Sequence, residues 1–393
     1  MAVPKLRFKE FKNEWKTTNL KQILSFKNGI NANKDSYGRG IKYISVGDIL
    51  NNTFITYDKI KGLVDINEKV FKENSVEYGD IIFQRSSETF NDIGQSNVYL
   101  DKEKVATFGG FVIRGKKIGN YNPLFLNYLL KSPYNRRKII IKGAGAQHYN
   151  ISQEELEKIN INFTNENEQK KIANLFSLLD KKIELQKQKI ETLKIYKKGL
   201  IIKFFNSLNC DEKQIKDIGV IITGTTPSKN NLNYWHTGNI AWVTPSDITE
   251  SKNIYSSEVC LTQLGLSVGR KLPTNSLLVT CIASIGKNAI LKVEGSCNQQ
   301  INAIIPNDDC DIDFLYYLFE HKKSYMQSIA GTSATSIINK SSFEKILVKI
   351  PTIDVQKKIS KTLSLIDNKI ELQNCLLENL IHLKKYLLQQ MFI

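Results

Sequence analysis

Proline is scarce in this chain, with 8 residues in 393, and no two prolines are adjacent. The Asn-Pro-Pro-aromatic motif of amino-methyltransferases is therefore excluded. Pro-Asp is also missing, which argues against a nuclease of the PD-(D/E)xK type. A complete P-loop is absent as well, since Gly286-Lys287 is followed by Asn288 and lacks the upstream glycine. We therefore expect no catalytic residues and no cofactor site in this chain.

Cysteine and long apolar runs are sparse too. The 6 cysteines have no Cys-x-x-Cys spacing, so the sequence indicates neither a metal site nor a disulfide framework. Reduced thiols in the cytoplasm fit this pattern best. The N-terminal residues MAVPKLRFKEF are broken up by charge, so no secretory signal is expected. No stretch approaches the length that crosses a bilayer, so we expect no membrane span.

Charge is the feature in which this chain departs most from an average protein. Lys and Arg number 55 against 39 Asp and Glu, a formal net charge of +16. Such a surplus favours a polyanionic partner, with nucleic acid as the first candidate and an anionic membrane surface as the second. A general bias toward lysine is the alternative cause. Hydrophobic content of 41% is ordinary for a folded protein, and the length allows two or three domains.

A long charged segment occurs twice in the sequence. Residues 169–206 align with 356–393 without a gap, and 18 of 38 positions are identical, which indicates an internal duplication. Apolar residues recur every three or four positions in both copies, as in the seam of a coiled coil. The seam residues that we predict, polar ones included, are Ile172, Phe176, Leu179, Ile183, Gln186, Ile190, Leu193, Ile359, Leu363, Ile366, Ile370, Gln373, Leu377 and Leu380.

Each copy predicts a helix about 55–60 Å long, at about 1.5 Å per residue. A lone helix would leave its apolar stripe in water, so we expect the two stripes to bury each other in an antiparallel pair. Gln186 and Lys197 interrupt the first stripe, and Gln373 and Lys384 interrupt the second at matching places. These polar residues either fix the register of the pair or lie at the edge of a loose interface.

The segments before the two helices combine strand-like runs with short helical patterns. IKYISV (41–46) and IAWVTP (240–245) are examples of the runs. The sequence therefore predicts an α+β fold, in which two similar mixed α/β domains are separated by two long antiparallel coiled-coil helices, with a pseudo-twofold internal repeat. The predicted boundaries are 1–165 for the first domain, 166–208 for the central helix, 209–351 for the second domain and 352–393 for the C-terminal helix.

The two domains have matching residues at several positions that we expect to belong to the framework of the fold. Val46-Gly47-Asp48-Ile49 matches Pro245-Ser246-Asp247-Ile248, and Ile93-Gly94 matches Ile285-Gly286. Because Asp48 and Asp247 recur, we predict a shared role in a turn or cap for them. The polar loops between these positions do not match. Two domains with one frame and different loops are expected to read two different short sequences.

The opening VPKLRFKEFKNEW (3–15), the order of domains and helices, and the QKKI…ELQ blocks resemble the specificity subunit of type I restriction-modification systems. The resemblance covers the whole chain and implies a non-catalytic DNA-binding subunit. Each domain would be a target recognition domain for one half of a bipartite asymmetric site in double-stranded DNA. The helices would form the spacer and dock two DNA methyltransferase subunits and, where the system has them, two restriction motor-nuclease subunits. S-adenosylmethionine, ATP and Mg²⁺ are then expected only in those partners.

Amide and guanidinium side chains read base edges, while Lys and Arg neutralise phosphates. On this basis we predict DNA contacts from polar loop residues, although any single exposed polar residue is more often only solvated. They are Lys34, Tyr37, Arg39, Arg85, Ser86, Ser87, Gln147, His148, Tyr149, Asn150, Thr225, Thr226, Ser228, Lys229, Thr244, Ser246, Ser284, Lys287, Gln299, Gln300, Thr332, Ser333, Thr335 and Ser336. Trp235 and Trp242 are expected in the core rather than as stacking platforms.

A non-catalytic coiled-coil scaffold, or a general basic DNA-binding protein, is the alternative interpretation of the same residues. It predicts protein partners along the helices and no sequence preference on DNA.

Overall fold

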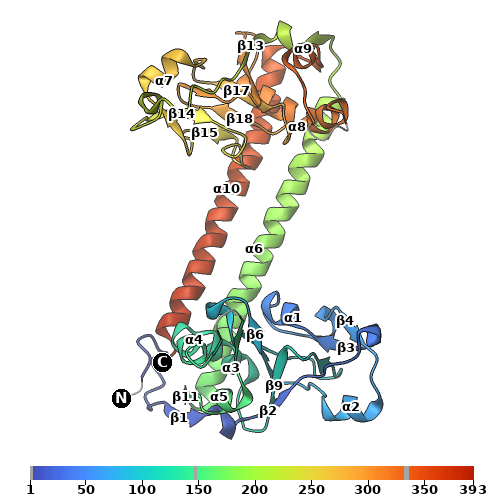
Figure 1. Cartoon of the computed structure of the whole chain (residues 1–393), viewed down its shortest axis with the longest axis vertical. Helices are drawn as coiled ribbons and strands as arrows, with labels where there is room; N and C mark the ends of the chain where they lie inside the picture. Colours follow the sequence, from blue (N-terminus) through green and yellow to red (C-terminus); the bar gives the residue numbers. More distant parts are fainter. Residues whose placement is uncertain (1–2, 146–147, 332–335) are drawn as a thin grey trace. The chain divides into compact units, whose positions relative to one another are not determined.

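The computed structural model describes residues 3–145, 148–331 and 336–393 of the chain and divides it into two units. Unit 1 comprises residues 1–187 and 375–393, and unit 2 comprises residues 188–374. Both units contain part of the long helices α6 (Glu166–Asn206) and α10 (Ile353–Gln390), which Figure 1 shows in green and red. Within the described ranges, no helix is both long and apolar enough to cross a membrane.

The globular part of unit 1, which we call its module, is built on a four-stranded antiparallel sheet of order β2-β9-β5-β7. A three-stranded sheet has the order β4-β3-β8, and β1 pairs with β11 and β6 with β10. The strands are β1 (Lys16–Asn19), β2 (Leu24–Asn28), β3 (Tyr37–Ile44), β4 (Gly62–Val64), β5 (Ile81–Gln84), β6 (Ser86–Ser87), β7 (Ser96–Val98), β8 (Thr107–Phe108), β9 (Val112–Lys117), β10 (Tyr149–Asn150) and β11 (Asn160–Phe163). The helices are α1 (Val46–Leu50), α2 (Glu68–Glu73), α3 (Pro123–Lys131), α4 (Pro133–Ile140) and α5 (Gln153–Glu157).

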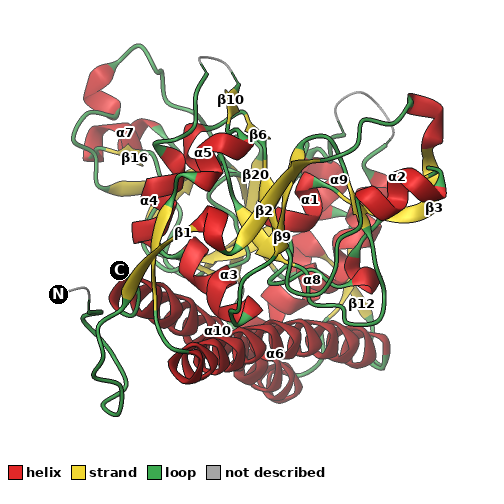
Figure 2. Cartoon of the chain, turned by 90° about the horizontal axis from the view of Figure 1, so that it is seen from below, coloured by secondary structure: helices red, strands yellow, loops and turns green. Residues whose placement is uncertain are grey.

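The module of unit 2 has a five-stranded sheet of order β13-β20-β17-β18-β15 and a three-stranded sheet of order β16-β14-β19. Its strands are β12 (Glu212–Gln214), β13 (Gly219–Thr223), β14 (Ile240–Val243), β15 (Asn253–Ile254), β16 (Cys260–Leu261), β17 (Ser276–Thr280), β18 (Asn288–Leu291), β19 (Gly295–Cys297), β20 (Ile301–Pro306) and β21 (Leu347–Lys349). The helices are α7 (Gln263–Val268), α8 (Ile312–Ile329) and α9 (Lys340–Glu344). Loops, green in Figure 2, connect these short elements.

The two modules share one topology. The order β13-β20-β17-β18 repeats β2-β9-β5-β7, with every pair antiparallel. In the smaller sheets, β14 pairs parallel with β19 and antiparallel with β16, just as β3 pairs with β8 and with β4. The pair β12–β21 corresponds to β1–β11. The predicted α+β fold with an internal repeat is therefore confirmed.

Asp48 and Asp247 have the shared structural role that the repeat predicts. The Asp48 Oδ2 atom accepts hydrogen bonds from the backbone N of Ser45 at 2.8 Å and from its hydroxyl at 2.7 Å. Asp247 Oδ2 accepts the same two bonds from Thr244, both at 2.7 Å. In unit 1 this capping box starts α1 at Val46, so the expected strand over 41–46 ends earlier, at Ile44.

One helix differs between the modules. Unit 1 has two short helices, α3 and α4, where unit 2 has the single helix α8. Pro133 accounts for the break, because proline lacks a backbone N–H and forces the preceding residue out of the helical region. Ser132 accordingly has ψ of 144° and caps α4 through a hydrogen bond to Asn135 N.

Each module is closed by two different long helices. In unit 1, Phe176 of α6 and Phe392, which follows α10, stack with ring centroids 5.6 Å apart, and Phe392 also packs on Phe125 at 5.7 Å. In unit 2, Phe205 of α6 packs on Phe314 at 5.2 Å. Phe205 and Phe392 are matching residues of the repeat. The end of each long helix thus completes the core of the module that the other long helix follows.

A polar triad of one buried tyrosine and a half-buried aspartate and lysine joins the same elements in each unit. In unit 1, Tyr128 donates a hydrogen bond to Asp180 at 2.8 Å, and Lys384 binds the same carboxylate at 2.5 Å. The pKa of Tyr128 is raised by burial and by the neighbouring Asp180, so the hydroxyl stays protonated and remains a donor.

The triad of unit 2 has the same chemistry. Tyr317 donates to Asp367 at 2.5 Å, and Lys197 binds that aspartate at 2.6 Å. Lys197 and Lys384, the polar interruptions of the predicted seam, thus reach across from one long helix to the other. Because the early part of one helix meets the late part of the other in each unit, the pairing is antiparallel, as predicted.

The predicted seam positions lie inside this packing. Ile172, Phe176, Ile183, Gln186, Ile190, Ile359, Leu363 and Leu380 are buried, and Leu179, Leu193, Ile366, Ile370, Gln373 and Leu377 are half-buried. The predicted segments 166–208 and 352–393 extend slightly beyond the helices themselves. Met391 and Phe392 leave α10 and enter the core of unit 1, where they are 3% and 2% exposed.

The N-terminal segment is tied to α6 by a buried ion pair. Arg7 binds Glu168 through both carboxylate oxygens, at 2.6 and 2.7 Å. The Glu168 side chain is fully buried and that of Arg7 is 9% exposed. Asn165 caps the start of α6 by accepting a hydrogen bond from the backbone N–H of Glu168 at 3.0 Å, while the Glu168 carboxylate binds Arg7.

Replacing Arg7 by Ala is predicted to cost about 3 kcal/mol of unfolding free energy, because it leaves the Glu168 carboxylate buried without its partner. Lys171→Ala is the matched control, since Lys171 and Glu10 form an exposed ion pair between the same segment and the same helix. Urea unfolding followed by circular dichroism measures both variants. Equal stability of the two would show that the buried pair does not hold the N-terminal segment.

Candidate nucleic-acid interface

In unit 1, four chain segments meet where strands of the two sheets end. Ile30, after β2, donates its backbone N–H to Phe108 O at 3.0 Å. Arg85, after β5, donates its backbone N–H to Phe111 O at 2.9 Å. The fourth segment contains strand β10, which pairs with β6. We call the described residues 29–32, 85–91, 109–111, 144–145 and 148–150 the loop edge of unit 1.

The same connections recur in unit 2. Thr225 N donates to Cys297 O at 2.9 Å, and Cys281 N donates to Gln300 O at 2.8 Å. Ala283 N donates to Ser336 O at 3.1 Å. We call the described residues 224–229, 281–284, 298–300, 331 and 336–337 the loop edge of unit 2. Each loop edge is therefore fixed by main-chain bonds, which leave its side chains free to vary.

Glycines at matching positions make the turn behind each loop edge possible. Gly94 and Gly286 have φ of 64° and 79°, a region that side chains disfavour. Each donates its backbone N–H to the strand before the turn, Gly94 to Gln84 O and Gly286 to Thr280 O. These turns explain why Ile-Gly recurs in both halves of the sequence.

Most of the predicted contacts in unit 1 come together at its loop edge. Arg85 is half-buried, and its Nη1 donates to Gly110 O at 3.3 Å. Ser86 and Ser87 lie opposite Asn150 and Tyr149 in the β6–β10 pair, and the Ser86 hydroxyl bonds to Asn150 Oδ1. His148 is exposed in the turn before β10, and Gln147 lies outside the described residues.

Lys34, Tyr37 and Arg39 lie beside the loop edge, at the start of β3. The Tyr37 hydroxyl accepts a hydrogen bond from Ala32 N at 3.3 Å, which connects this group to the segment after β2. Arg39 is paired with Asp65 at 3.2 Å, but both side chains are exposed, so this pair can exchange partners at little cost.

In unit 2, the predicted contacts form two groups. Thr226 and Gln299 are hydrogen-bonded at 2.5 Å, beside Thr225 and Gln300, and the exposed Ser228 and Lys229 continue the segment of Thr226. Ser284, Lys287 and Ser336 line a surface hollow of about 310 Å³ together with Lys323 and Gln327. Thr332, Ser333 and Thr335 lie outside the described residues.

Thr244 and Ser246 lie in the Asp247 turn rather than in either group. The Thr244 hydroxyl is bonded to Asp247, and it also lies 2.7 Å from the Ser246 hydroxyl. These atoms serve the capping turn already described, so the geometry gives Thr244 a structural function.

The two tryptophans support the loop edge of unit 2. Trp242 is 5% exposed, as expected for a core residue, and its indole N–H donates to Thr225 O at 2.9 Å. Trp235 is only half-buried, so its prediction as a core residue is wrong; it packs edge-on against Trp242 at 5.0 Å, and its indole N–H donates to Ser228 O. Both indoles thus hold the backbone of the segment after β13.

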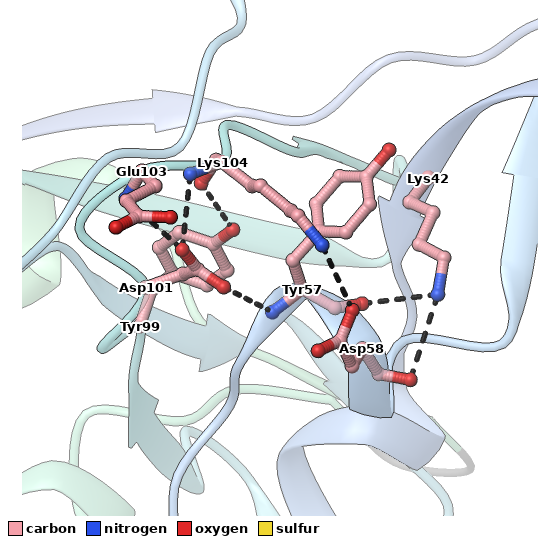
Figure 3. Close-up of polar contacts among 7 residues, drawn as sticks. All are labelled: Lys42, Tyr57, Asp58, Tyr99, Asp101, Glu103 and Lys104. Carbon is pink, nitrogen blue, oxygen red and sulfur yellow. Dashed lines mark hydrogen bonds and ion pairs between the residues drawn. The ribbon is translucent and has the colours of Figure 1, made fainter.

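Two basic residues of unit 1, Lys42 and Lys104, are engaged in structural contacts, as Figure 3 shows. Lys42 donates to the backbone oxygens of Tyr57 and Asp58 at 3.1 and 3.5 Å, and Lys104 pairs with the Asp58 carboxylate at 3.2 Å. Asp101 accepts three backbone N–H bonds, those of Lys104, Glu103 and Tyr57, which lower its pKa. These groups pin the turn after β7 to the segment before β4.

Arg136 is also committed to the fold. Its guanidinium donates to the backbone oxygens of Asn91, Ile93 and Gly94, at 2.7 to 3.0 Å. Burial lowers the pKa of Arg136 to about 10, which leaves it charged at neutral pH. In unit 2, Gln327 donates to Ile285 O in the corresponding place at 3.3 Å.

The sequence reasoning missed four residues that the structure adds to this surface: Asn31, Phe111, Lys323 and Gln327. Lys323 and Gln327 lie on α8, and only the fold brings them to the hollow beside Lys287. Because Phe111 precedes the apolar strand β9, the sequence pattern predicts a core residue, but its side chain is 70% exposed. No group of three His, Cys, Asp or Glu side chains that could hold a metal ion occurs among the residues described.

Two modules of one topology, each with a polar loop edge and each packed against two long helices, define a duplicated protein with two related polar surfaces. The model of the type I restriction modification DNA specificity domain matches residues 12–194 and again 208–382. The chain therefore belongs to this family of non-catalytic DNA-recognition subunits.

Curated relatives agree with this assignment. The putative type I restriction enzyme MjaX specificity subunit of Methanocaldococcus jannaschii is 27% identical over 391 residues, which cover 93% of this chain and 89% of the relative. The MjaIX specificity subunit of the same organism is 35% identical over 170 residues, 41% of this chain and 38% of that subunit. The HindI specificity subunit of Haemophilus influenzae is 23% identical, covering 87% and 94%.

Solved structures have the same fold. The S subunit of a type I restriction-modification system from M. genitalium is similar with a TM-score of 0.59 at 16% identity, covering 100% of this chain and 99% of that one. A chain from a study of complex assembly and conformational transition in the type I R-M system gives a TM-score of 0.66 at 12% identity, covering 95% and 96%.

Lys287 and Lys323 provide a test of the hollow in unit 2. If both lysines neutralise phosphates, replacing both by Ala should reduce the slope of log affinity against log salt by up to about 0.9 per lysine. Lys216→Ala is the control, because this exposed lysine precedes β13 while the loop edge follows it. DNA binding by the assembled complex is measured by fluorescence anisotropy at several salt concentrations. An unchanged slope in the double variant would exclude phosphate contacts there.

Proposed function

We propose that this chain gives a type I restriction-modification complex its DNA sequence specificity. The module of unit 1 contacts one half of a bipartite asymmetric site in double-stranded DNA, and the module of unit 2 contacts the other half. The paired helices α6 and α10 set the unspecified gap between the halves. Methylation, ATP use and cleavage take place in partner subunits, which bind S-adenosylmethionine, ATP and Mg²⁺.

One observation carries this proposal: the two modules share a hydrogen-bonded frame but differ in the side chains that the frame presents. The segment from β5 to Gly94 is four residues longer than the segment from β17 to Gly286. At the turn after β8 and β19, unit 1 has Gly110-Phe111 where unit 2 has Gln299-Gln300. Different side chains on one frame favour two different half-sites over one palindromic site.

The long helices also have a repeated apolar surface. Leu178 and Leu185 of α6 are 58% and 55% exposed, and the matching residues Leu365 and Leu372 of α10 are 61% and 68% exposed. Residues seven apart lie on one face of a helix, so each pair forms a small apolar patch. We propose that each patch binds one DNA methyltransferase subunit, since two identical patches suit two copies of one partner. Restriction motor-nuclease subunits would join this assembly where the system has them.

Exchange of the second module tests the specificity role. Replacing residues 209–351 by the corresponding module of a relative should change one half of the methylated sequence and leave the other half and the gap intact. Methylome sequencing of cells that express the complex provides the readout. A methylation pattern without any sequence preference, or one in which both halves change, would contradict the proposal and favour a basic coiled-coil scaffold.

Charged substitutions test the docking role. Leu178→Asp with Leu185→Asp should remove one of the two methyltransferase subunits, because docking would then bury two carboxylates in an apolar contact. Leu365→Asp with Leu372→Asp should remove the other, and the four-fold variant should bind none. Native mass spectrometry measures the subunit ratio. Full occupancy in the four-fold variant would place the docking surface elsewhere.

A further inference from the structure

Phe111 is an exposed aromatic side chain on a fixed backbone. Its ring is 70% exposed, although it lies between buried strands. A hydrogen bond from Val112 N to Gly109 O, at 3.0 Å, closes a tight turn around Gly110 and Phe111. The carbonyl of Phe111 accepts the backbone N–H of Arg85 at 2.9 Å, which anchors the turn to β5.

The two glycines before Phe111 allow this turn to pack closely against the rest of the module. A Cβ atom on Gly110 would lie 1.7 Å from Asn31 Oδ1, and one on Gly109 would lie 3.2 Å from the Tyr43 ring. No larger residue fits at Gly110 without displacing Asn31. The turn therefore packs closely against Asn31 and Tyr43, and its two backbone hydrogen bonds form without a partner, so we expect that ordering it on binding costs little.

The surroundings of Phe111 are polar and basic. Arg85 donates to the adjacent Gly110 carbonyl, and Ser86 and Asn150 lie beyond it in the β6–β10 pair. An apolar ring among guanidinium, hydroxyl and amide groups matches a DNA groove, in which the thymine methyl is the apolar feature among polar base edges. The core of a protein interface would instead be depleted of charge.

The position of Phe111 in the repeat supports the same conclusion. Gln300 of unit 2 accepts the backbone N–H of Cys281 just as Phe111 accepts that of Arg85. One frame thus presents an aromatic ring in unit 1 and two amides, Gln299 and Gln300, in unit 2. Amides bind base edges through hydrogen bonds, whereas a phenylalanine distinguishes bases through apolar contact.

We infer that Phe111 is a specificity-determining residue of the first module and that its ring contacts the methyl group of a thymine in the half-site that this module reads. This inference rests on the proposed function. It assigns one base position in that half-site to one side chain, and it predicts that the second half-site is read without an equivalent apolar contact.

Thymine-to-uracil substitution tests the inference, because it removes only the methyl group. The complex of the full chain with its methyltransferase subunits is bound to duplexes in which each thymine of the first half-site is replaced in turn. For one thymine, affinity should fall about fourfold, as expected for one methyl group removed from an apolar contact. In Phe111→Ala, affinity for the thymine duplex should fall, and uracil at that position should cause no further loss.

Two variants serve as controls. Leu232→Ala removes another side chain that is 70% exposed, in unit 2, and should change neither affinity nor the response to uracil. Phe111→Leu keeps an apolar side chain and should retain part of the discrimination. Thermal unfolding of each variant should match that of the parent, since the replaced side chains are exposed.

Three results would overturn the inference. Phe111→Ala could bind and methylate with unchanged discrimination against uracil, in which case the proposed function stands and Phe111 does not read DNA. Phe111→Ala could lose a methyltransferase subunit, which would show that the ring faces a protein. If the parent complex shows no sequence preference, the proposed function itself fails.

Discussion

In each unit, a lysine of one long helix and a tyrosine of the module bind the same aspartate of the other long helix. Asp180 and Asp367 are matching residues of the repeat, as are Lys197 and Lys384. A parallel in-register pair would place the two aspartates side by side, whereas the antiparallel pair places each against a lysine. Because an unpaired charge in a partly buried seam is costly, these triads fix both the direction and the register of the helices.

The modules can diverge because their frame is made of main-chain bonds. The bonds from Ile30 to Phe108 and from Thr225 to Cys297 involve only backbone atoms. The bonds from Arg85 N to Phe111 O and from Cys281 N to Gln300 O likewise join backbone atoms. The fold therefore does not require particular side chains at these positions. The glycines are the exception, because there is no space for a side chain beside them. A loop edge can change its chemistry while the triads and the aromatic core keep the module in place.

The sequence predicts the repeat, the helix seam and the α+β class, because these depend on periodicity and local pattern. It marks Lys197 and Lys384 as polar interruptions but not their partners, since Tyr128 and Tyr317 approach the helices only through the tertiary fold. The exposure of Phe111 cannot be predicted from the sequence either, because an apolar residue before the run VIR (112–114) is expected to be buried in the core. In the structure, the Gly109–Val112 turn leaves Phe111 exposed instead. This turn packs against Asn31 and Tyr43, which are distant from it in the sequence.

Not all of the 55 Lys and Arg residues are available to a polyanion. Arg7, Arg136 and Lys384 are bound to carboxylates or carbonyls inside the fold, and Lys42 and Lys104 hold a turn. Such groups still contribute to the long-range field, which attracts DNA of any sequence. They do not lie at a loop edge, so under the proposed function discrimination between sequences falls to the few side chains of each loop edge. If the proposed function holds, a handful of substitutions at the loop edges would give the chain a new target, while the rest of it stays unchanged.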